Sequence, residues 1–235
     1  MHLFLIRSDG SGLRQITAGA FIDEFGAWAP DGATIAFRSN RDGSPELYQM
    51  QPDGANVRRL TFGGAPNTFP SYSPNGSIVF NSKRTGVWQI FRLAPGKTPV
   101  QITNNEFSDE NPVYSPDGRL IAFQSNRQGR DAIYVINADG SNERAVSGEE
   151  AATVFPAWIS NSVLTFSSSP NADSPVDNVK AVRLDTGTVS TIPIKAGFFV
   201  RWDPRWGHAA IVSGTYPRTN LFRCNSDGTN LVQLA

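Results

Sequence analysis

The sequence has little of what most enzymes depend on. Its 235 residues include one cysteine, Cys224, and two histidines, and they show no cysteine–histidine spacing typical of a zinc site. No Gly-x-Ser-x-Gly motif of a serine hydrolase occurs. The glycines are spread through turn motifs and form no phosphate-binding loop ahead of a helix. We therefore expect no catalytic residues, no metal, no cofactor and no enzymatic activity.

An excess of charge and long hydrophobic runs are missing as well. Lys+Arg and Asp+Glu number 21 each, so the formal net charge is zero and nothing favours a nucleic-acid partner. Every apolar run is shorter than the roughly 18 residues of a membrane span, so we expect no membrane insertion. Residues 1–6 are apolar except for His2, but they lack a charged leader region and a small-residue cleavage site. They predict a strand and not a signal peptide.

Turn-forming and aromatic residues, in contrast, are plentiful. There are 21 glycines and 16 prolines, and 11% of the residues are aromatic, a mixture typical of short strands joined by tight turns. One aromatic recurs every 42–44 residues, three times directly before a Ser/Ala-Pro-Asp/Asn-Gly turn: Trp28, Tyr72, Tyr114, Trp158 and Trp202. This regularity predicts an internal repeat that spans the whole chain.

Other landmarks keep the same period. Arg41, Arg84 and Arg127 are 43 residues apart, and an Asp-Gly turn recurs at residues 9–10, 53–54, 139–140 and 227–228. Runs of β-branched and aromatic residues with a period of two lie between these turns and predict four antiparallel strands in each repeat. Such a unit is typical of a β-propeller blade. We interpret the repeated aspartates as turn residues, and the arginines as architectural or solvated.

The repeat predicts an all-β fold in a single domain over residues 1–235. Five full blades cover residues 18–61, 62–103, 104–147, 148–194 and 195–235, and residues 1–17 match only the last two strands of a blade. Two arrangements are open: an incomplete propeller of the six-bladed type, which we favour, or a five-bladed ring with a spare hairpin. An incomplete ring would expose a blade edge at which the chain could associate with itself.

The repeat resembles a known family. Residues 112–147 carry its pattern almost in full, with Pro112, the segment 114–118 (Tyr-Ser-Pro-Asp-Gly), Arg127 and the turn 139–140 (Asp-Gly). This pattern is similar to the WD40-like repeat of TolB-type β-propellers. The resemblance implies a non-enzymatic scaffold in the periplasm, or elsewhere outside the cytoplasm, that binds a protein or peptide through one face or the central channel. Two alternatives are the substrate-gating propeller of a prolyl-oligopeptidase-like serine peptidase and a carbohydrate-related propeller.

Residues at the start of the first strand of each repeat are the best candidates for a binding site. They vary between copies, as a binding face would, and a propeller places them where the chain crosses a ring face near the central channel. Their acidic members could attract a cation or a basic partner. An alternative interpretation is that they hold the loops together and cap the channel. The candidates are Asp23, Glu24, Phe25, Asn67, Phe69, Asp109, Glu110, Phe155 and Phe199.

Overall fold

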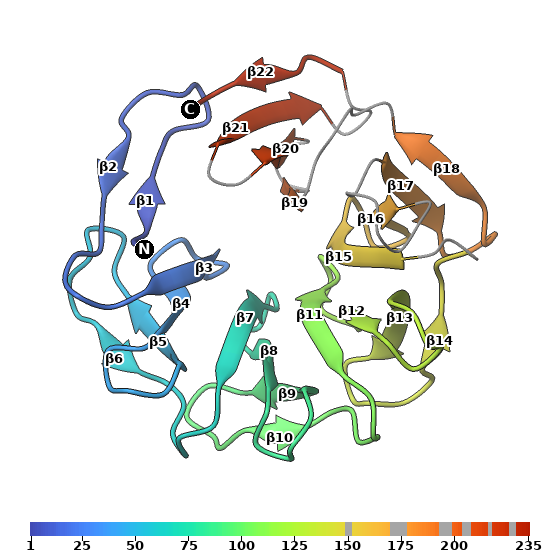
Figure 1. Ribbon diagram of the computed structural model, residues 1–235, viewed down its shortest axis with the longest axis horizontal. Coiled ribbons are helices and arrows are strands. Elements are labelled where there is room, and N and C mark those ends of the chain that lie inside the picture. The colour runs from blue at the N-terminus through green and yellow to red at the C-terminus, as the bar shows by residue number, and fades with distance from the viewer. Residues whose placement is uncertain (149–151, 170–177, 193–198, 204–207, 216–217, 226–228) are drawn as a thin grey trace.

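The computed structural model is a ring of antiparallel β-sheets around a central opening (Figure 1). It describes residues 1–148, 152–169, 178–192, 199–203, 208–215, 218–225 and 229–235. All regular secondary structure in this part of the chain is β-strand, which confirms the predicted all-β propeller fold. Within those ranges, no segment forms a helix long and apolar enough to cross a membrane.

Each four-stranded sheet takes its strands from one sequence repeat, in chain order. The first sheet has β3 (Asp23–Trp28), β4 (Ile35–Ser39), β5 (Glu46–Met50) and β6 (Arg58–Arg59). The second has β7 (Asn67–Tyr72), β8 (Ile78–Ser82), β9 (Gln89–Leu93) and β10 (Val100–Gln101). The third has β11 (Asp109–Tyr114), β12 (Leu120–Ser125), β13 (Ala132–Asn137) and β14 (Arg144–Ala145).

The remaining sheets continue this order. The fourth sheet has β15 (Ala152–Trp158), β16 (Val163–Ser169), β17 (Asn178–Arg183) and β18 (Val189–Ile192). The fifth has β19 (Phe199–Asp203), β20 (His208–Thr215), β21 (Arg218–Asn225) and β22 (Val232–Gln233). The N-terminal hairpin is a separate two-stranded sheet of β1 (Phe4–Leu5) and β2 (Arg14–Gln15). Strands β3, β7, β11, β15 and β19 lie nearest the central opening (Figure 1).

The repeated aspartates have the turn role expected of them. Gly32 and Gly54 have φ values of 70° and 88°, the left-handed conformation that a tight turn requires. The Asp31 carboxylate accepts a hydrogen bond from the backbone N–H of Ala33, 2.9 Å away. The carboxylates with the same bond to the residue two positions later are Asp9, Asp53, Asp117 and Asp139. Asp227 lies outside the described residues.

Neighbouring sheets pack face to face through apolar side chains of their second and third strands. Phe37, Phe80, Phe123 and Phe166 hold equivalent positions in four repeats, and all are fully buried. The aromatic that ends the inner strand adds to these interfaces in the second, third and fourth sheets, where it is Tyr72, Tyr114 and Trp158. Trp158, for example, is buried, and its Nε1–H donates to the carbonyl oxygen of Val113 in the preceding sheet, 3.1 Å away.

The N-terminal hairpin has its own position in the ring. It lies between the first sheet and the fifth sheet, with the C-terminus beside it (Figure 1). Leu3 and Leu5 pack against the first sheet. On the other side the turn at Gly10 lies against Leu234, because a Cβ at Gly10 would be 3.6 Å from the Cδ2 atom of that leucine.

Candidate binding face

The first residue of an inner strand is buried in three of the sheets. Asp23, Asn67 and Asp109 begin β3, β7 and β11, and their side chains have almost no exposed surface. Each accepts a hydrogen bond from an arginine in the same sheet, 17 or 18 residues later in the chain. The donors are Nη2 of Arg41 to Asp23 (3.1 Å), of Arg84 to Asn67 (3.0 Å) and of Arg127 to Asp109 (2.9 Å).

The arginines are held in place by further contacts. The Nε–H of each donates to a serine hydroxyl of the second strand, at 3.0 Å for Ser39, 3.0 Å for Ser82 and 2.9 Å for Ser125. Each guanidinium also lies over two buried aromatic rings, which for Arg127 are those of Phe123 and Tyr134. These contacts confirm the architectural interpretation of the arginine series. They also neutralise Asp23 and Asp109 within their own sheets.

Four of the inner strands, β3, β7, β11 and β15, share an unusual backbone conformation at their third or fourth residue. Phe25, Phe69, Asn111 and Phe155 have φ values of 53–55°. In each case the strand pairing shifts by one residue at this point, which is the pattern of a β-bulge. A bulky residue in this conformation costs about 1–3 kcal/mol, so the rest of each sheet must hold it there. Residues under such strain cluster at binding sites.

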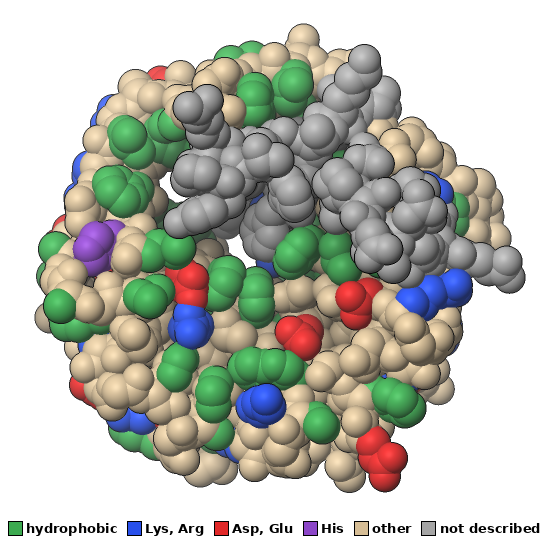
Figure 2. All heavy atoms as spheres, viewed as in Figure 1, with side chains coloured by type: hydrophobic (Ala, Val, Ile, Leu, Met, Phe, Trp, Pro, Cys, Tyr) green, Lys and Arg blue, Asp and Glu red, His purple; other side chains and the backbone are tan. Residues whose placement is uncertain are grey.

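The bulges bring two predicted site residues together. The rings of Phe25 and Phe69 belong to neighbouring sheets, and their centroids are 4.0 Å apart. Both side chains are half-buried, as is that of Phe155. On the face shown in Figure 2, hydrophobic and acidic side chains lie together around the central opening. An apolar contact surface beside negative charge is therefore available at this opening.

The two predicted glutamates lie directly before the bulges but differ in their surroundings. Glu24 forms an ion pair with Arg38 of the adjacent strand. Glu110 is half-buried and forms no ion pair with any described residue. Burial raises the pKa of the Glu110 carboxyl, and the negative charges of Asp131 and Asp109 raise it further, while Lys83 acts in the opposite direction. Ionisation of Glu110 is therefore less favourable in the folded protein than it is for a glutamate in water.

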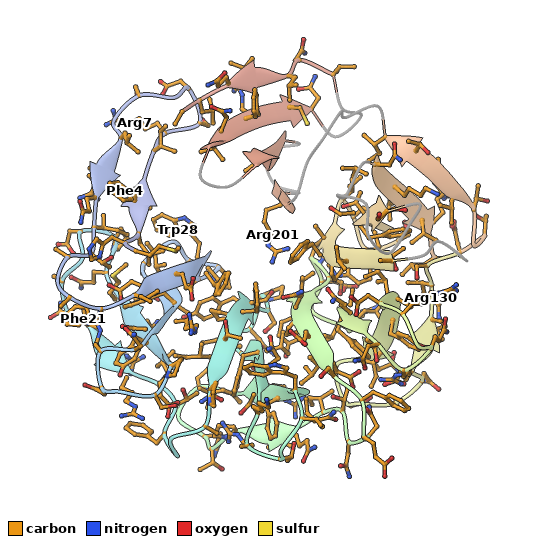
Figure 3. All side chains as sticks on the ribbon, viewed as in Figure 1. Phe4, Arg7, Phe21, Trp28, Arg130 and Arg201 are labelled. Atoms are coloured by element: carbon orange, nitrogen blue, oxygen red, sulfur yellow. The ribbon has the colours of Figure 1, made fainter. Side chains whose placement is uncertain are left out.

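Asn111, which directly follows the candidates Asp109 and Glu110, occupies the bulge position of the third repeat. Sequence reasoning missed one residue of this region. Arg201 extends from β19 toward the central opening (Figure 3), and its Nη1–H donates to the carbonyl oxygen of Pro156, 3.2 Å away. Burial lowers the pKa of Arg201 to about 10, so the guanidinium remains charged at neutral pH. The degenerate fifth repeat gave no signal for it.

Phe199 differs from the other predicted aromatics. It is the first residue of β19, where the pairing with β20 runs without a bulge from Phe199↔Val212 to Asp203↔His208. Its side chain lies outside the part of the chain that the structure describes.

Comparisons with known proteins agree on one family. The family model described as "TolB beta propeller domain" matches residues 1–187. The chain is 36% identical over 159 residues to a protein named "Protein TolB homolog" from Chlorobium luteolum. The aligned region covers 66% of this chain and 36% of that protein. It is 40% identical over 76 residues to the "Tol-Pal system protein TolB" of Geobacter sulfurreducens, over 32% of this chain and 18% of that protein. The chain thus spans little more than a third of the first relative and less than a fifth of the second.

A solved structure shows the same fold. The crystal structure of TolB from Acinetobacter baumannii superimposes with a TM-score of 0.83 over 97% of this chain and 57% of that chain. At 20% sequence identity, this similarity concerns the fold alone.

Proposed function

Because the chain belongs to the TolB β-propeller family, we propose that it is a non-enzymatic scaffold that binds a protein or peptide through the inner strands at its central opening. The observation that carries this proposal is the strained bulge of Phe25, Phe69, Asn111 and Phe155. A packed sheet does not need a left-handed phenylalanine at the same point of successive repeats. A surface that presents aromatic side chains to a partner gives a reason to maintain it.

The same surface indicates the chemistry of the partner. The paired rings of Phe25 and Phe69 would hold an apolar side chain, since aromatic residues dominate the energetic centre of protein interfaces. Glu110 would pair with a basic group, because a bound cation stabilises the carboxylate that burial disfavours. We therefore propose a segment in which a basic residue lies near an apolar one.

We propose that the chain acts outside the cytoplasm, in the periplasm, as membership of this family suggests. One relative is named a Tol-Pal system protein. We accordingly propose that the partner is a protein of a similar system. We do not propose the peptidase or carbohydrate alternatives, because none of the contacts among the described residues favours them.

A binding measurement tests the proposal directly. The probe is the lipid-free Pal protein of the organism that encodes the chain, titrated calorimetrically into the wild type and into the Phe25→Ala/Phe69→Ala variant. We expect the variant to bind at least roughly tenfold more weakly, the effect of removing an interface anchor. Phe62→Ala is the matched control, because this exposed phenylalanine precedes β7 and belongs to no bulge. Equal affinity of all three proteins would refute the proposed site.

A further inference from the structure

The chain holds one of its own guanidinium groups against an inner strand at the central opening. Arg201 of β19 donates from Nη1 to the carbonyl oxygen of Pro156, 3.2 Å away on the inner strand of the preceding sheet. Its side chain extends from β19 toward the opening (Figure 3). Pro156 directly follows Phe155, the strained residue of the β15 bulge. This contact shows that a carbonyl oxygen beside a bulge can receive a guanidinium group.

The third sheet has the same acceptor but no such arginine. Pro112 follows the bulge residue of β11 as Pro156 follows that of β15, so it is the counterpart of Pro156 in the repeat. The position that corresponds to Arg201 on the next inner strand is Ala157, which is also 45 residues after its proline. A methyl group cannot donate a hydrogen bond. The carbonyl oxygen of Pro112 thus receives no guanidinium from the position equivalent to Arg201.

Two side chains directly before Pro112 add further acceptors. Asn111 is only 4% exposed, and its Oδ1 accepts no hydrogen bond from any described residue. Its Nδ2–H donates to Gln124 at 3.0 Å, and Gln124 is the register partner of Glu110, which forms no ion pair within the described ranges. An unsatisfied buried acceptor costs roughly 1–3 kcal/mol. A donor supplied from outside the chain would therefore stabilise this strand.

We propose that residues 110–112 bind the guanidinium group of an arginine side chain of the partner protein, an inference that rests on the proposed function and specifies its basic residue. The Glu110 carboxylate supplies the opposite charge, while Asn111 Oδ1 and the Pro112 carbonyl oxygen accept further N–H groups. A guanidinium has five N–H donors fixed in one plane and can serve several acceptors at once. A lysine ammonium is a compact, strongly hydrated charge without this fork, so the subsite selects arginine over lysine.

Two capped peptides that differ only in their basic residue test this selectivity. The probes are acetyl-Ala-Leu-Arg-Ala-amide and acetyl-Ala-Leu-Lys-Ala-amide, each titrated into the full chain and followed by NMR. We expect the arginine peptide to bind at least roughly tenfold more tightly and to shift the side-chain amide signals of Asn111. Asn111→Gly should reduce this preference to less than about threefold, because glycine tolerates the positive φ of the bulge but lacks the acceptor. Glu110→Gln should weaken the binding of both peptides alike, because it removes an attraction that both cations share.

Asn142→Gly is the matched control, because Asn142 also has a φ of 55° but lies between β13 and β14, away from the bulges. This variant should keep the preference of the wild type. The proposal is overturned if the wild type binds neither peptide, binds both equally, or has a preference that survives in Asn111→Gly. If such a result is found while Phe25→Ala/Phe69→Ala still weakens binding of the Pal protein, the arginine subsite is refuted and the proposed function stands.

Discussion

Asn67 lies between the buried carboxylate of Glu46 and the guanidinium of the exposed Arg84, and its replacement by aspartate is a sensitive test of the junction between the first two sheets. Its Nδ2–H donates to the Glu46 carboxylate at 2.6 Å, while its Oδ1 accepts from Arg84 at 3.0 Å. Glu46 is fully buried and also accepts from Arg59 and the Thr61 hydroxyl. An amide satisfies both neighbours, because one of its atoms donates and the other accepts.

The expected loss of stability in Asn67→Asp follows from these contacts. The new carboxylate repels Glu46 and attracts Arg84, and each effect is about 4 kcal/mol for charges about 4 Å apart at an effective dielectric constant near 20. Because Arg84 is exposed, solvent screens its attraction more than it screens the repulsion from buried Glu46, so the two effects together do not stabilise the variant. The hydrogen bond to the charged Glu46 is lost without replacement, so we expect the free energy of unfolding to fall by about 1.5–3 kcal/mol at neutral pH.

The loss should depend on pH. Two adjacent buried carboxylates share a proton, so one pKa of the pair rises above its ordinary value in the folded variant. A raised folded-state pKa means that the folded state binds more protons than the unfolded state as the pH falls. The variant therefore recovers stability relative to the wild type on acidification.

Urea unfolding followed by tryptophan fluorescence, at about pH 7.5 and about pH 5, measures both effects. The control is the double variant Glu46→Gln/Asn67→Asp, which places the side chains found at the next junction, where Gln89 begins β9 and Asp109 begins β11. It should regain part of the lost stability. The reasoning fails if Asn67→Asp is as stable as the wild type near neutral pH, or if its deficit does not shrink on acidification.

Three further changes test separate features of the fold. Gly54→Ala should destabilise the chain by more than Gly43→Ala in thermal unfolding, because a Cβ at Gly54 would collide with the carbonyl oxygen of Ile16, whereas one at Gly43 would contact nothing within 4 Å. Equal effects would contradict this, since both residues have positive φ and each substitution carries about 1–2 kcal/mol of strain from that source alone. Trp158→Phe should lower the free energy of unfolding by about 1 kcal/mol through its lost hydrogen bond, but Trp28→Phe by less than about 0.5 kcal/mol; the opposite order in urea unfolding would be inconsistent with the packing. Glu110→Gln should raise stability at neutral pH, and the difference from the wild type should shrink as the pH falls and the carboxyl of raised pKa becomes protonated; a difference that is constant with pH would show that Glu110 is not the cause.

Strands and turns could be predicted from the sequence because their signals are local. Alternating apolar residues and Asp-Gly pairs limit the backbone within a few residues, and Gly32 and Gly54 adopt the positive φ that their turns require. The 42–44-residue repeat predicted the arrangement beyond single turns, because if one copy of the repeat forms a sheet, each other copy is expected to form the same sheet. The exposure of Trp28 did not follow from its motif, because it depends on which strands precede it in space.

The candidate site could be predicted only in part, because two of its features depend on partners distant in the sequence. Asp23 and Asp109 looked like residues of an accessible face, but they are buried beside Arg41 and Arg127. The aspartates and arginines recur with the same spacing, so the sequence could have indicated that they pair with each other. The left-handed conformation of Phe25 and its equivalents was not predictable, because phenylalanine has no local preference for it and the bulge in the strand pairing imposes it.

Amide hydrogen exchange of the full chain, with and without the lipid-free Pal protein, tests most directly the claim that the inner strands bind a partner. The bulges interrupt the pairing of β3, β7 and β11, so their amides should exchange measurably in the free chain. We predict that Pal slows exchange around Phe25, Phe69 and Asn111 and leaves the outer strands β6, β10 and β14 unchanged. Slower exchange confined to the outer strands, with none at the bulges, would contradict the account.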